Sequence, residues 1–144
     1  MKKDSSWSRP CLADYILTFR KPGQNPIPVK TDYSRNDWIK LASACWYDID
    51  QSDTLNYTRA REDKDEAHIC PLQLEVYRRC IRLWSNRGET VADWFAGIGS
   101  GGVVALEQER RFIGIELKES YFKQAVKNLQ NMVKHENLLA ACGD

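Results

Sequence analysis

Four glycines fall within six residues of the chain, directly after a short apolar run that ends in an aspartate. They are Gly97, Gly99, Gly101 and Gly102, and the aspartate is Asp93. A glycine backbone turns tightly and lets a ligand approach without meeting a Cβ atom. The cluster therefore predicts a ligand-binding turn between a strand and a helix. The alternative is that Asp93 only caps the next turn and that the glycines only permit packing, although each glycine loses much backbone freedom on folding.

A second acid stands at the spacing that an adenosine-binding site requires. Gly97, Gly99 and Gly102 satisfy the pattern G-x-G-x-x-G, and Glu116 follows Gly97 by nineteen residues. A carboxylate near the end of the next strand can accept hydrogen bonds from both ribose hydroxyls of an adenosine. The glycines and this acid together predict a site for an adenosine-containing cofactor.

The residues just before the glycines favour one such cofactor. A dinucleotide site keeps its helix N-terminus free for a pyrophosphate. Here Asp93 stands four residues ahead of Gly97, with Trp94 and Phe95 between them. A fixed negative charge repels pyrophosphate but suits the amine and sulfonium charges of S-adenosyl-L-methionine. We therefore expect S-adenosyl-L-methionine, with an oxidoreductase domain that binds NAD or FAD as the alternative.

The pattern around the glycines predicts an α/β fold. Residues 90–95 are expected to form a buried strand, residues 100–108 a helix and residues 111–117 a second strand. A final helix would carry an apolar stripe from Phe122 to Val133. In such a strand–helix–strand unit the two strands lie parallel and the crossover is right-handed.

Another helix is predicted upstream of this unit. Pro71 suits its first turn, and Gly88 is a natural residue at its C-terminal end. Apolar side chains recur at helical spacing on one face, so we expect the polar face to contact solvent, with contacts of its arginines to phosphates as the alternative. The polar face consists of Glu75, Arg78, Arg79 and Arg82.

The first half of the chain divides into two segments. Residues 1–29 contain a predicted strand over Tyr15–Phe19, which Pro22 and Gly23 end. Residues 30–66 form a loop-rich insertion with one short helix. That helix is expected to carry Trp38, Leu41, Ala42, Cys45 and Trp46 at helical spacing. The cofactor-binding region then occupies residues 67–144.

The composition limits the class of protein. The 144 residues suit one domain, and 21 basic against 20 acidic residues give no charge signal for a nucleic acid or a membrane. Five cysteines without a C-x-x-C pair, and only two histidines, indicate free thiols in a reducing compartment and no metal site. Because no run of about eighteen apolar residues occurs, we expect a cytoplasmic protein with no membrane partner.

The glycine segment resembles the amino-methylating DNA methyltransferases, which modify N6 of adenine or N4 of cytosine. Their motif D-P-F-x-G-x-G-[ST] is matched by residues 93–100, "DWFAGIGS", with Trp94 in place of the proline. The stretch "RRFIGIELKESYFKQAVKNL" is similar to the family's next segment, in which an acid, here Glu116, binds the ribose. The resemblance implies an incomplete Rossmann-like fold of the methyltransferases that use S-adenosyl-L-methionine.

An upstream element extends the resemblance. The residues "HICPLQL" are similar to H-P-x-x-K-P-x-x-L, with Cys70 where the lysine would stand. Its place before the glycines implies the beta order of motifs, in which the catalytic half of the enzyme comes first, as in phage and prophage methylases. The chain then corresponds to a C-terminal cofactor-binding half. Residues 30–66 would then hold the target-recognition region. By resemblance the cofactor site comprises His68, Pro71, Leu72, Asp93, Phe95, Ala96, Gly97, Gly99, Ser100 and Glu116.

The family's catalytic tetrapeptide is missing from the sequence. In the family, [DNS]-P-P-[YFW] holds the amine of a flipped base, but no Pro-Pro pair occurs here. Asn25-Pro26-Ile27-Pro28 lacks both the adjacent proline and the aromatic residue, so we assign no catalytic residue. The chain is then half of a split enzyme acting on DNA, a gene remnant or a catalytically dead interaction module. Missing strands would expose sheet edges and favour a complementary polypeptide or self-association.

Overall fold

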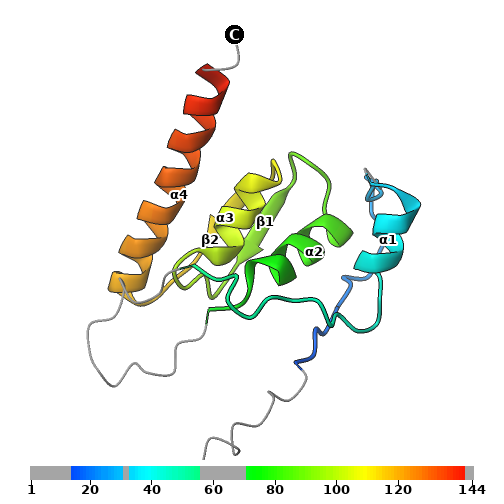
Figure 1. Cartoon of the computed structure of the whole chain (residues 1–144). Helices are drawn as coiled ribbons and strands as arrows, with labels where there is room; N and C mark the ends of the chain where they lie inside the picture. Colours follow the sequence, from blue (N-terminus) through cyan, green and yellow to red (C-terminus); the bar gives the residue numbers. More distant parts are fainter. Residues whose placement is uncertain (1–13, 31–32, 56–70, 142–144) are drawn as a thin grey trace, which may run out of the picture.

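The computed structural model of the chain describes residues 14–30, 33–55 and 71–141. Figure 1 shows a small sheet with helices beside it, a first short helix that stands apart from the sheet, and a long last helix that projects beyond it. The elements in chain order are α1 (Arg35–Leu41), α2 (Leu74–Trp84), β1 (Thr90–Asp93), α3 (Ser100–Glu107), β2 (Arg111–Gly114) and α4 (Glu119–Ala141).

The two strands are hydrogen-bonded neighbours and run parallel. Thr90 pairs with Arg111, and at the other end Asp93 pairs with Gly114. Helix α3 connects them, so the predicted strand–helix–strand unit and its parallel pairing are confirmed. This register brings the segments after β1 and β2 to the same edge of the sheet.

The core lies between α3 and its neighbours. Helix α3 contacts both strands, and α2 and α4 pack against α3. Val104 and Ala105 are completely buried in α3, where Val91 of β1 and Phe112 of β2 pack against the core. Every residue from Ser100 to Ala105 is buried, which leaves this helix without a polar face.

The opposite face of the sheet carries exposed apolar side chains. Ala92 and Ile113 point away from α3, and Ile113 is 55% exposed. The two strands are also shorter than predicted: β1 ends before Trp94 and Phe95, and β2 ends at Gly114. The expectation of a fully buried first strand is therefore wrong, because within the described ranges helices cover only one face of the sheet.

The strand predicted over Tyr15–Phe19 does not form. Residues 14–30 contain no strand, and Tyr15 and Phe19 are each 86% exposed. A strand needs a partner for its backbone hydrogen bonds. In the part of the chain that the structure describes, the sheet consists of β1 and β2 alone.

Both upstream helices form, with other boundaries than predicted. Helix α1 begins after the capping residue Ser34 and ends at Leu41, so the segment with Cys45 and Trp46 lies outside it. Helix α2 has Gln73 and Ser85 at its two cap positions, so Pro71 lies before its first turn and Gly88 beyond its C-terminal cap. None of the helices in the described ranges is long and apolar enough to cross a bilayer.

The arginines of α2 bind the insertion instead of facing solvent. Arg79 is only 8% exposed, and its guanidinium donates two hydrogen bonds, of 2.9 and 2.8 Å, to the Asp48 carboxylate. It also lies 5.2 Å above the Trp46 ring. Arg78 contacts Asp53 at 2.8 Å. The prediction of a solvated polar face is wrong for these arginines, because acids of the insertion lie over it.

Candidate cofactor site

The glycine loop, residues 94–99, lies between the end of β1 and the start of α3. The Ala96 N–H donates to the Ile115 carbonyl at 2.9 Å, and the Ile115 N–H donates to the Asp93 carbonyl at 2.8 Å. The loop is thus fixed to the segment that follows β2. This arrangement places it at the carboxyl ends of two parallel strands, the edge where ligands bind in open α/β sheets.

Glu116 binds the glycine loop directly. One carboxylate oxygen accepts a hydrogen bond from the Gly97 N–H at 2.8 Å, and the other accepts one from the Lys118 N–H at 2.9 Å. Glu116 and Gly97, nineteen residues apart in the sequence, are therefore in direct contact. A carboxylate offers about four acceptor positions. The half-buried Glu116 can hold the loop and still accept hydrogen bonds from a ligand.

Asp93 contacts the loop at its first residues, where β1 ends. Its Oδ1 accepts a hydrogen bond from the Phe95 N–H at 2.9 Å, so it caps the turn that follows β1. Its Oδ2 lies 3.0 Å from the point that a Cβ on Gly101 would occupy. The alternative that Asp93 caps the turn is therefore correct for its Oδ1. The carboxylate also places a negative charge between the loop and the first turn of α3.

Two glycines of the loop adopt left-handed backbone conformations for different reasons. Gly99 has φ +87° and caps α3, and a Cβ there would lie 3.1 Å from the Ala125 Cβ. Gly97 has φ +54°, and a Cβ there would meet nothing closer than the Phe95 carbonyl at 4.0 Å. Packing against α4 explains Gly99. The space beside Gly97 is open, which is the arrangement that a ligand approaching the backbone requires.

The other residues predicted for the site fall into three groups. Ala96 and Ser100 are buried at the base of the loop, whereas Phe95 is 89% exposed. Pro71 and Leu72 precede α2, and none of the hydrogen bonds described for the chain joins either of them to the loop. His68 lies outside the described residues.

Tyr77 of α2 is a neighbour of the site that sequence patterns missed. Its ring lies 3.0 Å from the point that a Gly101 Cβ would occupy, the same distance as the Asp93 Oδ2. Burial, and then the nearby charge of Asp93, raise the pKa of the Tyr77 phenol. In the sequence, helical spacing places Tyr77 among the apolar side chains of the predicted upstream helix and gives it no further role. The spacing could not show that this face meets Asp93.

Tyr77→Phe should reduce the loss of stability at alkaline pH. The folded pKa of Tyr77 lies above its ordinary value of 10.0, so above that pH the unfolded chain loses the phenolic proton first. The free energy of unfolding must then fall as pH rises through the unfolded pKa. Urea unfolding at about pH 8 and about pH 10.5 measures this difference. Equal pH dependence in Tyr77→Phe and the unaltered chain would contradict it.

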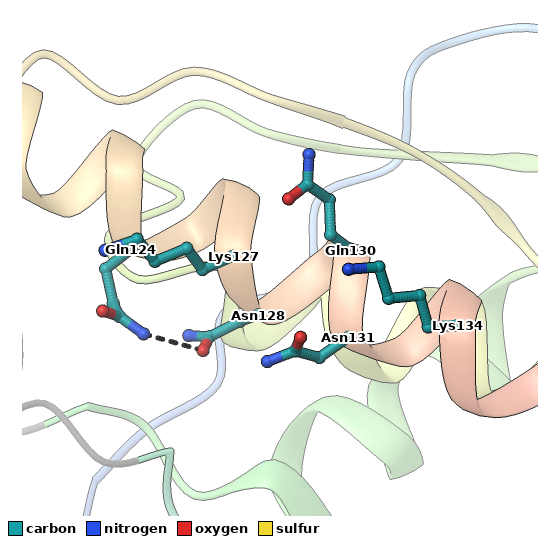
Figure 2. Close-up of a pocket in the computed structure, with 6 residues that line it drawn as sticks. All are labelled: Gln124, Lys127, Asn128, Gln130, Asn131 and Lys134. Carbon is teal, nitrogen blue, oxygen red and sulfur yellow. Dashed lines mark hydrogen bonds between the residues drawn. The ribbon is translucent and has the colours of Figure 1, made fainter.

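A polar hollow lies along α4, and none of the residues predicted for the site lines it. It has a volume of about 420 Å³ and is lined by amides and lysines of that one helix. Figure 2 shows these side chains along successive turns, with a hydrogen bond between Gln124 and Asn128. Of the residues that line the hollow, Asn128 reaches the glycine loop.

Known proteins resemble the chain over most of its length. The sequence profile of the N6/N4 DNA methylase family matches residues 4–127. The type II methyltransferase M.BglI of Bacillus subtilis is 31% identical over 86% of this chain and 32% of its own length. M.MjaI, a type II methyltransferase of Methanocaldococcus jannaschii, is 29% identical over 74% of this chain and 35% of its own length. The chain spans about a third of these two relatives.

Solved structures agree with the sequence relatives. TTHA0409 of Thermus thermophilus, crystallised with S-adenosyl-L-methionine, is 26% identical and superimposes with a TM-score of 0.60. The match covers 79% of this chain and 41% of TTHA0409. The fold is thus an incomplete Rossmann-like methyltransferase fold. The sequence profile, the curated relatives and the fold agree, and the chain belongs to the amino-methylating (N6/N4) DNA methylase family.

Proposed function

We propose that the chain binds S-adenosyl-L-methionine at the glycine loop, as the cofactor-binding part of an enzyme that methylates DNA. The methylated group would be the exocyclic amine of adenine or cytosine. The observation that supports the proposal most is the open space beside Gly97, whose N–H is held by Glu116 while Asp93 caps the same loop. Two carboxylates therefore bind the backbone of one loop, Glu116 at Gly97 and Asp93 at Phe95, and a missing side chain at Gly97 leaves open space.

The charges of the site favour a cationic nucleoside over a dinucleotide. A pyrophosphate at the N-terminus of α3 would lie near the Asp93 carboxylate and be repelled by it. The amine and sulfonium groups of S-adenosyl-L-methionine would be attracted by the same charge. When bound, this cofactor supplies a methyl group that is activated by its attachment to a positive sulfur.

Each predicted residue has a role in this proposal. Glu116 accepts hydrogen bonds from the ribose hydroxyls through the acceptor positions that Gly97 and Lys118 leave unused. Gly97 allows close approach, Gly99 and Ser100 begin the helix, and Ala96 supports the turn. Phe95 offers an exposed aromatic ring for contact with the ligand. By resemblance, His68, Pro71 and Leu72 of the upstream element belong to the same cofactor site.

Methyl transfer to DNA needs groups that this sequence lacks. No [DNS]-P-P-[YFW] motif is present, so the proposal includes a complementary catalytic part that holds the flipped base. The free face of the sheet at Ala92 and Ile113, with the neighbouring Ile115, is where such a part could pack. DNA is therefore proposed as the substrate of the assembled enzyme, and self-association as the competing use of the same apolar face.

Isothermal titration calorimetry of the chain with S-adenosylhomocysteine and with NAD tests the cofactor. We expect binding of S-adenosylhomocysteine and no heat with NAD. Binding of NAD alone would replace the proposal with a dinucleotide-binding domain, and binding of neither would refute it. A methylation assay with tritiated S-adenosyl-L-methionine and DNA should detect no transfer by the chain alone. Transfer should appear when a polypeptide that carries the missing motif is added.

A further inference from the structure

The glycine loop is also held from α4, by a pair of side-chain amides. The Asn128 Nδ2 donates a hydrogen bond of 2.9 Å to the Ile98 carbonyl. The Gln124 Nε2 in turn donates one of 2.9 Å to the Asn128 Oδ1, the dashed contact in Figure 2. Gln124 is only 8% exposed although it is polar. The two amides thus form a chain of hydrogen bonds from a buried side chain to the loop backbone.

This pair fixes a peptide unit that glycine would otherwise leave mobile. The Gln124 donor holds the oxygen end of the Asn128 amide, so the NH₂ end must face the Ile98 carbonyl. The N–H of the same peptide unit, at Gly99, donates to the Ala96 carbonyl at 2.8 Å. Both polar groups between Ile98 and Gly99 are therefore bonded. Glycines on both sides of Ile98 have the largest backbone freedom of any residue.

We propose that Asn128, oriented by Gln124, is a positioning residue for the cofactor loop. It holds residues 97–99 in their conformation before a ligand arrives, so that less ordering is needed on binding. Helix α4 is a suitable support because Ala125, one turn earlier, already packs against Gly99. The nature of the ligand rests on the proposed function, whereas the hold on the loop does not.

Asn128→Ala tests the hold in the ligand-free protein. Hydrogen exchange of the Gly97 and Gly99 amides, measured by NMR, should become at least about 5-fold faster when this hydrogen bond is lost. Asn131→Ala is the matched control, since Asn131 is an exposed amide further along the same helix and lines the same hollow. It should leave both exchange rates unchanged.

The affinity for S-adenosylhomocysteine separates positioning from a purely structural role. Asn128→Ala should raise the dissociation constant by about 5-fold, and Asn131→Ala should not change it. Gln124→Met keeps the side-chain volume but removes the donor that orients Asn128. Gln124→Met should also raise the dissociation constant, without lowering the midpoint of thermal unfolding. If Asn128→Ala does not fold, the affinity of Gln124→Met decides whether the amide pair positions the loop.

The outcomes are distinct for the two proposals. Unchanged exchange at Gly97 and Gly99 overturns the role of Asn128, and so does faster exchange with unchanged affinity. If the unaltered chain binds no S-adenosylhomocysteine, the proposed function fails. The exchange rates alone then decide whether Asn128 holds the loop.

Discussion

Glu116→Ala is expected to weaken the binding of S-adenosylhomocysteine by about 10- to 100-fold, the factor that corresponds to about 1.5–3 kcal/mol for hydrogen bonds to a charged group. Two losses contribute. The proposed acceptor for the ribose hydroxyls disappears, and the Gly97 N–H loses the partner that it now has at 2.8 Å. Calorimetry measures one change in affinity that contains both the lost ribose acceptor and the lost partner of the Gly97 N–H.

Two further variants separate these contributions. Glu116→Gln keeps one carbonyl oxygen in place of two carboxylate oxygens, so it can hold either Gly97 or Lys118 but not both in the same way. We expect an affinity between those of the unaltered chain and Glu116→Ala. Glu119→Ala removes an exposed acid three residues further along, which pairs with Lys123, and serves as the charge control. An affinity in Glu116→Ala equal to that of the control would contradict the proposed contact with the ribose.

The neighbourhood of the glycine loop could be predicted from sequence because its residues are placed by two adjacent strands. The parallel register pairs Asp93 with Gly114, and Glu116 follows two residues later. A carboxylate at that point lies at the same edge of the sheet as the loop that follows β1. Spacing along the chain was therefore enough to predict that Glu116 lies at the edge of the sheet that carries the glycine loop, but not that it accepts a hydrogen bond from the Gly97 N–H.

Features that depend on distant partners could not be predicted in this way. Alternating apolar residues around Leu17 indicate a strand, but a strand forms only where another can pair with it. Arg79 looked solvated on the helix because its partner Asp48 lies 31 residues away in an irregular segment. Asn128 occupies a polar stretch of α4, and its bond to Ile98 spans 30 residues. Local periodicity contains no information about such contacts.

Gly102→Ala is expected to lower the free energy of unfolding of the chain by about 1–3 kcal/mol, the usual cost of forcing an extra methyl group into a packed core. A Cβ at this position would lie 2.6 Å from the Phe112 Cε1 and 2.8 Å from the Leu129 Cδ2. Alanine favours a helix by up to about 1 kcal/mol relative to glycine, so the steric cost must exceed that gain. Because the Phe112 ring is rigid and packs against the core, we expect the steric cost to exceed the gain in helix propensity.

A double-mutant cycle tests whether the Phe112 ring is the cause. Phe112→Leu alone should destabilise the chain by leaving a cavity, but it also makes room for a methyl group on residue 102. Gly102→Ala with Phe112→Leu should therefore be more stable than the sum of the single changes predicts, by about 0.5–3 kcal/mol. Urea unfolding followed by circular dichroism gives the four values. Additive changes would mean that the Phe112 ring is not the cause of the cost, and would leave the contact with Leu129 of α4 to explain it.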